Sequence, residues 1–167
     1  MKIFITGFMG SGKSHWGRVW ADKHGMRFFD LDKEIEFSAG KTIQEIFSAA
    51  GEEHFREIET SCLRAFQNKD NFILSCGGGA ACFNDNMNWM NAQGLTIFLS
   101  VPPAVLVQRI MDDTTDRPLI KEKDPAKLIA FVDELLAVRE PFYFGAQIIL
   151  HEETLTKNSL NDLIVQS

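Results

Sequence analysis

The chain has 167 residues, a length that suits one domain with its own core, and we expect residues 1–167 to form that single domain. The net charge of −6 argues against a broad nucleic-acid surface. No stretch approaches the roughly 18 apolar residues of a membrane span, and the N-terminus lacks the pattern of a signal peptide. We therefore expect a monomeric cytoplasmic protein that binds neither nucleic acid nor membranes.

The first predicted elements are a buried strand at 2–6 and a helix at 13–24, with the sequence GFMGSGKS at 7–14 joining them. This sequence fits the phosphate-loop pattern G-x-x-x-x-G-K-[ST], in the strand, loop and helix context that the pattern requires. Glycines let backbone N–H groups approach phosphate oxygens at a helix N-terminus, where the dipole favours anions. The pattern predicts that Lys13 reaches the β- and γ-phosphates of ATP and that Ser14 ligates Mg²⁺. A glycine-rich turn that only caps the helix is the alternative.

The rest of the chain alternates strands with helices. Further strands are predicted at 27–30, 72–75, 95–100 and 146–150. Helices are predicted at 33–37, 42–47, 52–67, 84–92, from 102 onward, at 125–139 and at 155–165. Glycines at 40 and 51 are expected to break them, and the charged, aperiodic segment 112–124 is predicted to be a mobile lid. This order indicates the α/β class, a three-layer α/β/α fold of the P-loop NTP hydrolase type with a five-stranded parallel sheet covered on both faces.

Several further residues follow strands or stand on helices, where they could form a second site beside the loop. Ligands of open α/β sheets gather outside the carboxyl ends of the strands. The residues are Asp30, Asp32, Arg56, Gly77, Gly78, Gly79, Arg117 and Arg139. Each also has a structural explanation. Asp30 could cap a helix, Arg56 could pair with Glu52 or Glu59, and the glycine run could be a turn.

In this order behind a phosphate loop, these residues resemble the shikimate kinase family, over residues 7–143 of the chain. The resemblance implies ATP-dependent phosphorylation of the 3-hydroxyl of shikimate to shikimate 3-phosphate, a step toward chorismate and the aromatic amino acids, with Mg²⁺ as the metal. A planar carboxylate in the acceptor suits guanidinium groups, which offer charge and bidentate geometry together. Phosphoryl transfer asks the protein mainly for positioning and for neutralisation of spread negative charge.

The resemblance also implies a role for each residue. Catalysis falls to Lys13, Asp32 and Arg117, the last from the closing lid. ATP is bound by Gly10, Ser11, Gly12, Lys13, Ser14, His15, Arg109 and Arg117. Mg²⁺ is held by Ser14 and Asp30. Shikimate is bound by Asp32, Arg56, Gly77, Gly78, Gly79 and Arg139.

Two positions depart from the family pattern and leave the nucleotide contacts open. His15 stands where the family commonly has Thr or Ser, and residues 151–155 lack the proline of the family's adenine loop. Two other functions remain as alternatives: another small-metabolite kinase such as a gluconate kinase, and a nucleotide-binding regulatory module without transfer activity. The tripeptide at 68–70 places its aspartate one position too early for the N-K-x-D element of a GTPase.

Overall fold

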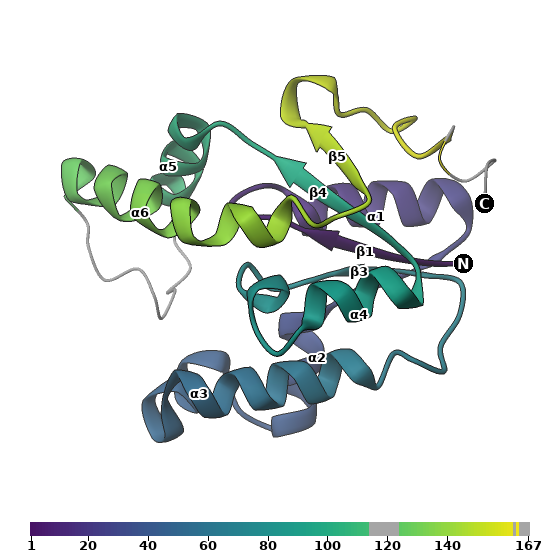
Figure 1. The fold of residues 1–167 in the computed structure, drawn as a ribbon, viewed down its shortest axis with the longest axis horizontal. Coiled ribbons are helices and arrows are strands. Elements are labelled where there is room, and N and C mark those ends of the chain that lie inside the picture. Colours follow the sequence, from purple (N-terminus) through teal and green to yellow (C-terminus); the bar gives the residue numbers. More distant parts are fainter. Residues whose placement is uncertain (114–123, 162, 164–167) are drawn as a thin grey trace.

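The computed structural model of the chain describes residues 1–113, 124–161 and 163, and its centre is one parallel sheet (Figure 1). The strands are β1 (Lys2–Thr6), β2 (Arg27–Asp30), β3 (Phe72–Ser75), β4 (Leu95–Ser100) and β5 (Ile148–His151). Their order across the sheet is β2-β3-β1-β4-β5, and every pair of neighbours is parallel. The predicted α/β fold with five parallel strands is confirmed.

The last strand begins two residues later than the predicted 146–150. The backbone N–H of Ala146 donates to the carbonyl of Tyr143, and that of Gln147 donates to the side chain of Thr96 at 2.9 Å. These two N–H groups are therefore used outside the strand ladder. Pairing with β4 starts only at Ile148, opposite Ile97.

The helices enclose the sheet on both faces. They are α1 (Lys13–His24), α2 (Leu31–Ala39), α3 (Ile43–Arg64), α4 (Asn86–Gln93), α5 (Pro103–Asp112) and α6 (Pro125–Tyr143), with short 3₁₀ turns at Ala80–Cys82 and Glu152–Thr154. In the described part of the chain, each helix is too short or too polar to cross a membrane.

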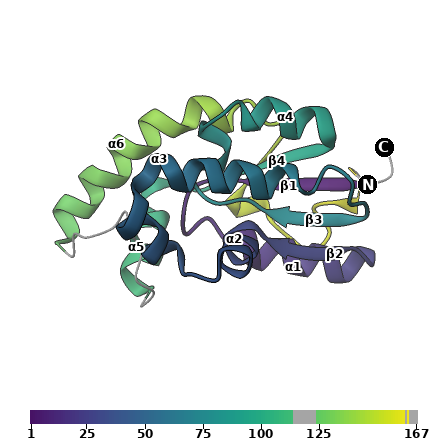
Figure 2. The same cartoon turned by 90° about the horizontal axis from the view of Figure 1, so that it is seen from below.

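Alternate residues of each strand face opposite layers. Ile3 and Ile5 of β1 pack with Trp20 of α1 and with Leu160, whereas Phe4 belongs to the larger core formed with α2 to α6. Figure 2 shows α1 on one side of the sheet and α3, α4 and α6 on the other. The predicted three layers are therefore present.

The predicted helices at 42–47 and 52–67 form a single element, α3, that bends where the break was expected. Gly51 has φ 79° and ψ −179°, a conformation that only glycine adopts without strain. Thr42 and Glu45 form a capping box, in which each side chain accepts a hydrogen bond from the other residue's backbone N–H, at 3.2 and 2.7 Å. The capping box fixes the N-terminus of α3.

Other helix boundaries also differ from the predicted ones. Helix α2 begins at Leu31 because Asp30 caps it, and α6 continues through Pro141 to Tyr143. The predicted helix at 155–165 is wrong for 155–160, which form no α-helix. There the side chains of Ser159 and Thr156 accept from nearby backbone N–H groups and compete with helical bonding.

The predicted lid at 112–124 lies mostly outside the described residues, and so does Arg117. Its two ends are described. Asp112 is the last residue of α5, and Asp124 caps α6 by accepting a hydrogen bond of 2.9 Å from the backbone of Ala126.

Candidate active site

The loop between β1 and α1 has the backbone expected of a phosphate-binding loop. Gly10 and Gly12 have φ of 80° and 88°, in the left-handed region that favours glycine. The ammonium group of Lys13 donates to the carbonyls of Gly7 and Phe8 at 2.9 and 2.8 Å. The loop therefore curls around a buried positive charge at the start of a helix, which is the electrostatic setting for an anion.

Ser14, Asp30 and Ser75 meet where α1 faces the ends of β2 and β3. The hydroxyl of Ser14 donates to Oδ2 of Asp30 at 2.5 Å and lies 3.1 Å from the hydroxyl of Ser75. Oδ1 of Asp30 accepts from the backbone of Asp32 at 3.2 Å. Asp30 thus caps α2 with one oxygen and reaches the phosphate loop with the other.

Arg56, on α3, is buried between two glutamates. Its Nη1 donates to Glu59 at 2.8 Å, and its Nη2 and Nε donate to Glu52 at 2.9 and 3.2 Å. The ring of Phe83 lies 4.4 Å from the guanidinium carbon. Burial raises the pKa of Glu59 above its ordinary value, and the positive charge of Arg56 offsets only part of that rise. The structural explanation of Arg56 as an ion-pair partner is therefore correct, and the side chain still lines a cavity.

Each glycine of the 77–79 run lies against a different charged group. A Cβ on Gly77 would lie 2.8 Å from carboxylate oxygens of both Asp32 and Glu59. A Cβ on Gly79 would lie 2.5 Å from Nη2 of Arg56. Real Cβ contacts are longer than these distances. The charged side chains can therefore approach the backbone this closely only because residues 77–79 have no side chains.

Gly78 joins the run to the phosphate loop and to α6. A Cβ there would lie 3.3 Å from the backbone nitrogen of Met9 and 3.6 Å from Nη1 of Arg139. The carbonyl of Gly78 accepts a hydrogen bond from the hydroxyl of Tyr143. Arg139 is 4% exposed, and its Nη1 has no hydrogen-bond partner among the described residues. A buried donor in this state is prepared for an oxygen from outside the chain.

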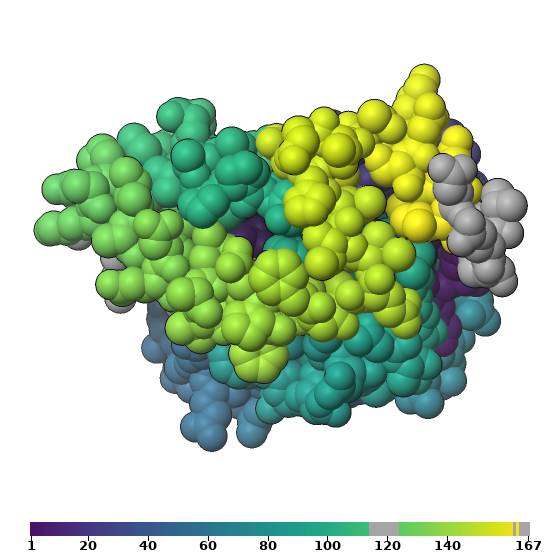
Figure 3. All heavy atoms as spheres, turned by 45° about the horizontal axis from the view of Figure 1, so that its top comes forward, coloured from purple at the N-terminus to yellow at the C-terminus, as the bar shows by residue number. Residues whose placement is uncertain are grey.

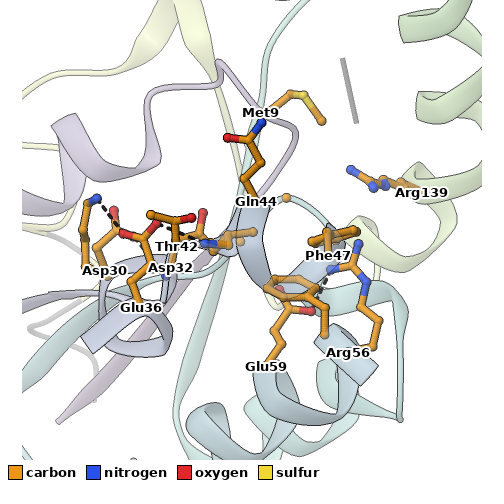
Figure 4. A pocket seen from close by; sticks show the side chains of 16 residues that line it. Met9, Asp30, Asp32, Glu36, Thr42, Gln44, Phe47, Arg56, Glu59 and Arg139 are labelled. Atoms are coloured by element: carbon orange, nitrogen blue, oxygen red, sulfur yellow. Dashed lines mark hydrogen bonds and ion pairs between the residues drawn. The ribbon is translucent and has the colours of Figure 1, made fainter. Parts of the chain in front are cut away.

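Two cavities share one wall, and Figure 4 shows the side chains that line the first of them. The acceptor cavity, as we name the first, has a volume of about 450 Å³, and the nucleotide cavity, the second, has about 500 Å³. The acceptor cavity is lined by Arg56, Glu59, Gly79, Arg139, Phe47, Phe55 and others. The nucleotide cavity is lined by Gly10, Gly12, Lys13, Ser14, His15, Arg109 and others. Both are lined by Met9, Asp30, Asp32, Gly77 and Gly78.

The structure therefore places nearly all the described residues of the predicted set along two adjoining cavities. Ser11 is the one described residue of the predicted set that lines neither cavity, because its hydroxyl is buried. Sequence reasoning missed Ser75, Phe47 and Tyr143 as site residues. Phe47 stands at an apolar position of a helical pattern, which by itself indicates only a core residue. Ser75 and Tyr143 reach the site through contacts with residues that are distant in the sequence.

Comparisons with known proteins show the family of the chain. The family model described as shikimate kinase matches residues 9–167. The chain is 41% identical to the shikimate kinase of Bacteroides thetaiotaomicron over 155 residues, which cover 93% of this chain and 89% of that protein. A crystal structure of shikimate kinase from the same organism has a TM-score of 0.93 and 38% identity, with coverage of 99% of this chain and 98% of that chain.

A second solved structure carries a ligand in its description. Shikimate kinase from Acinetobacter baumannii, in complex with shikimate, has a TM-score of 0.86 and 32% identity, with coverage of 99% of this chain and 90% of that chain. These similarities extend over nearly the whole length of the proteins compared. The chain belongs to the shikimate kinase family.

Proposed function

We propose that this protein transfers the γ-phosphoryl group of ATP to the 3-hydroxyl of shikimate, with shikimate 3-phosphate and ADP as products. One observation carries the proposal: the nucleotide cavity and the acceptor cavity share a wall that includes Asp30, Asp32 and Gly77. An acceptor and a triphosphate in these cavities meet along that wall. In-line transfer needs such adjacency more than it needs covalent participation of the protein.

The arginines support an acceptor that carries a carboxylate. A guanidinium has five N–H donors, and the bonds from Arg56 to Glu52 and Glu59 use one on each of its three nitrogens. Those bonds leave two further N–H donors of Arg56, one on Nη1 and one on Nη2, which lie in the plane of the guanidinium group. Arg139 adds its own buried Nη1 in the same cavity. We propose that the carboxylate of shikimate accepts from both arginines, as charge-assisted bonds favour.

Mg²⁺ fits the residues present at the loop. It binds proteins through one or two carboxylates and otherwise through water and substrate phosphates, always with oxygen ligands. The hydroxyl of Ser14 donates a hydrogen bond to Asp30, so its oxygen can still face a cation, and Asp30 supplies negative charge beside it. We propose that these two residues hold the metal, Ser14 directly and Asp30 through water. When bound, Mg²⁺ neutralises charge that develops on the phosphate oxygens.

The remaining steps fall to Lys13 and Asp32. Lys13 is held by the carbonyls of Gly7 and Phe8, and a phosphate oxygen in the loop would offer its ammonium a charged partner in their place. Asp32 lines both cavities, so we propose that it orients the reacting hydroxyl and accepts its proton. A loose transition state needs little early proton removal, so orientation is the larger part of this role.

A panel of acceptors tests the function. Purified protein with MgATP is expected to release ADP with shikimate and far more slowly with gluconate or nucleoside monophosphates. Loss of shikimate-dependent ADP release from folded protein would overturn the proposal, and faster turnover of gluconate would move the protein to another branch of small-metabolite kinases. Tight ATP binding with no acceptor-dependent turnover would identify a regulatory module instead.

We also propose that residues 1–167 act as one domain, as a monomer in the cytoplasm. A single sheet and a continuous core on each face support one folding unit. Light scattering after gel filtration should give a mass near 18.9 kDa. A mass of twice that value at micromolar concentration would contradict the monomer.

A further inference from the structure

Arg109 of α5 connects two segments that are distant in the sequence. Its Nη1 donates to the carbonyl of Gly10 in the phosphate loop at 3.2 Å. Its Nη2 forms an ion pair with Glu152, in the 3₁₀ turn that follows β5. Figure 3 shows the surface hollowed where α5, α6 and the segment after β5 meet, with purple residues of the N-terminal part at the bottom of the hollow. The ion pair therefore belongs to the rim of the nucleotide cavity, which Arg109 lines.

The two bonds constrain the guanidinium in a particular way. N–H bonds of a guanidinium lie in its plane, so the carbonyl of Gly10 and the carboxylate of Glu152 together fix that plane. The two faces of the group remain the surfaces on which a flat aromatic ring stacks. The side chain of Arg109 is 40% exposed, so solvent or a ligand reaches it. An arginine fixed in this way meets a nucleobase without first losing its rotamer freedom.

We propose that Glu152 is a positioning residue for the nucleotide: its ion pair orients Arg109 at the cavity rim and so strengthens the binding of ATP and ADP. The inference rests on the proposed function, because it takes the nucleotide to occupy the cavity that holds the phosphate loop. Glu152 acts through Arg109 and touches neither phosphate nor acceptor. This proposal gives the segment at 151–155 a function in nucleotide binding, although the segment lacks the proline of the family's adenine loop.

The pair is suited to positioning rather than to stabilising the fold. The side chain of Glu152 is 27% exposed, and an ion pair between half-exposed groups adds little to folding free energy. Removal of the pair should leave the thermal midpoint nearly unchanged. An effect on nucleotide affinity then reports the orientation of Arg109 and not a loss of structure.

The test is equilibrium binding of MgADP, measured by calorimetry without acceptor. Glu152→Gln is expected to weaken binding about three- to tenfold, the range of a guanidinium–aromatic contact that loses its geometry. Glu153→Gln is the matched control, since it removes the same charge from the next, exposed residue of the turn, and binding should stay within twofold of wild type. Should Glu152→Gln fail to fold, Glu152→Asp keeps the charge and should show a smaller loss in the same direction.

A double mutant and a kinetic measurement separate positioning from other roles. In an Arg109→Ala background, Glu152→Gln should cause no further loss of MgADP affinity, because its effect passes through Arg109. In turnover assays, Glu152→Gln should raise the KM for ATP and leave kcat and the KM for shikimate unchanged. Wild-type affinity in Glu152→Gln, tighter binding, or additive losses in the double mutant would each overturn the inference. Wild-type protein that binds no MgADP would instead overturn the proposed function itself.

Discussion

The hydroxyl of Ser14, in the second residue of α1, donates a 2.5 Å hydrogen bond to Oδ2 of Asp30, the last residue of β2. Strand β3 lies between β1 and β2 in the sheet, and its last residue, Ser75, is 3.1 Å from the same hydroxyl. Residues at the carboxyl ends of neighbouring parallel strands thus converge on the first turn of the phosphate-loop helix. The proton of Ser14 points at Asp30, which leaves the oxygen's lone pairs for a cation.

Asp30→Asn is expected to weaken the use of Mg²⁺. The amide oxygen can still accept from the backbone N–H of Asp32 while the NH₂ group faces the hydroxyl oxygen of Ser14, so the fold should persist, but the negative charge beside the metal is lost. A change at a residue that supports a metal ligand typically costs about 10- to 100-fold in metal affinity or activity. The half-saturating free Mg²⁺ concentration, measured at constant ATP, should rise by that order.

The matched control is Asp22→Asn, which removes the same charge from an exposed position on α1. Its Mg²⁺ dependence should equal that of the wild type. An Asp30→Asn enzyme with an unchanged Mg²⁺ titration would show that this carboxylate does not support the metal.

Gly79→Ala should disable acceptor binding while sparing the nucleotide. Gly79 has φ −102°, which alanine adopts freely, so the backbone is not strained. The new methyl would lie 2.5 Å from Nη2 and 2.6 Å from Nη1 of Arg56, and the guanidinium must move away. Loss of a charge-assisted contact of about 2 kcal/mol corresponds to a roughly 30-fold higher KM for shikimate. The KM for ATP should change little, whereas the thermal midpoint should fall, because the displaced guanidinium weakens its buried ion pair with Glu59.

Arg56→Ala provides the internal check on this explanation. If Gly79 acts through Arg56, the double variant should bind shikimate no worse than Arg56→Ala alone. Additive losses would mean that the methyl group obstructs the cavity directly and that the position of Arg56 is not the cause.

Much of the fold could be predicted because its signals are local. The strands at 72–75 and 95–100 match the predicted bounds, since each is a short apolar run with turn residues beside it. The pattern of residues 155–160 by itself allows a helix, which is why the sequence predicts one there. Besides the local bonds of Ser159 and Thr156, distant partners hold the segment in another conformation: Trp20 donates from its indole to the carbonyl of Thr156, and Lys23 donates to Asn158 and Asn161. Such tertiary bonds leave no mark in the local pattern.

In the candidate site, too, some residues could be predicted from a local motif and others depend on tertiary packing. Lys13 and Ser14 follow from a contiguous motif, and the motif context is enough to place them beside a phosphate-binding loop. The burial of Glu59 and the pairing of Arg109 with Glu152 depend on how helices pack, which residue spacing does not encode. Tyr143 is the extreme case, since 65 residues separate it from its hydrogen-bond acceptor.

The buried carboxyl of Glu59 should make stability depend on pH. Burial raises its pKa in the folded protein above the ordinary 4.5, with the charge of Arg56 opposing that rise. Between 4.5 and the raised value the folded protein holds a proton that the unfolded chain has released, so the free energy of unfolding falls as pH rises. The side chain of Glu59→Gln cannot ionise, so this variant lacks the corresponding pH dependence of the free energy of unfolding.

Urea unfolding of the wild type and of Glu59→Gln from pH 4.5 upward measures this effect. The stability of the wild type relative to the variant should decrease with rising pH until the folded carboxyl has ionised. A difference that stays constant, or that grows with pH, would show that Arg56 outweighs burial and that the carboxyl ionises at or below its ordinary pKa.

Tyr143→Phe should loosen the wall that the two cavities share. Tyr143 is the single tyrosine of the chain, it is fully buried, and its ring stacks on Phe98 with centroids 5.1 Å apart. Burial raises the pKa of Tyr143, so its hydroxyl keeps the proton that it donates to the carbonyl of Gly78. Phenylalanine keeps the ring but removes this donor, and an unsatisfied buried carbonyl costs about 1–3 kcal/mol.

The free energy of unfolding in urea should fall by about that amount, and the KM for shikimate should rise because Gly78 lies against Arg139 and lines the acceptor cavity. Tyr143→Leu also loses the stacked ring and should cost more in stability than Tyr143→Phe. An unchanged urea midpoint in Tyr143→Phe would mean that water takes over the hydroxyl's bond to Gly78. The glycine run would then owe its position to packing alone, and the hydroxyl would have no part in shaping the acceptor cavity.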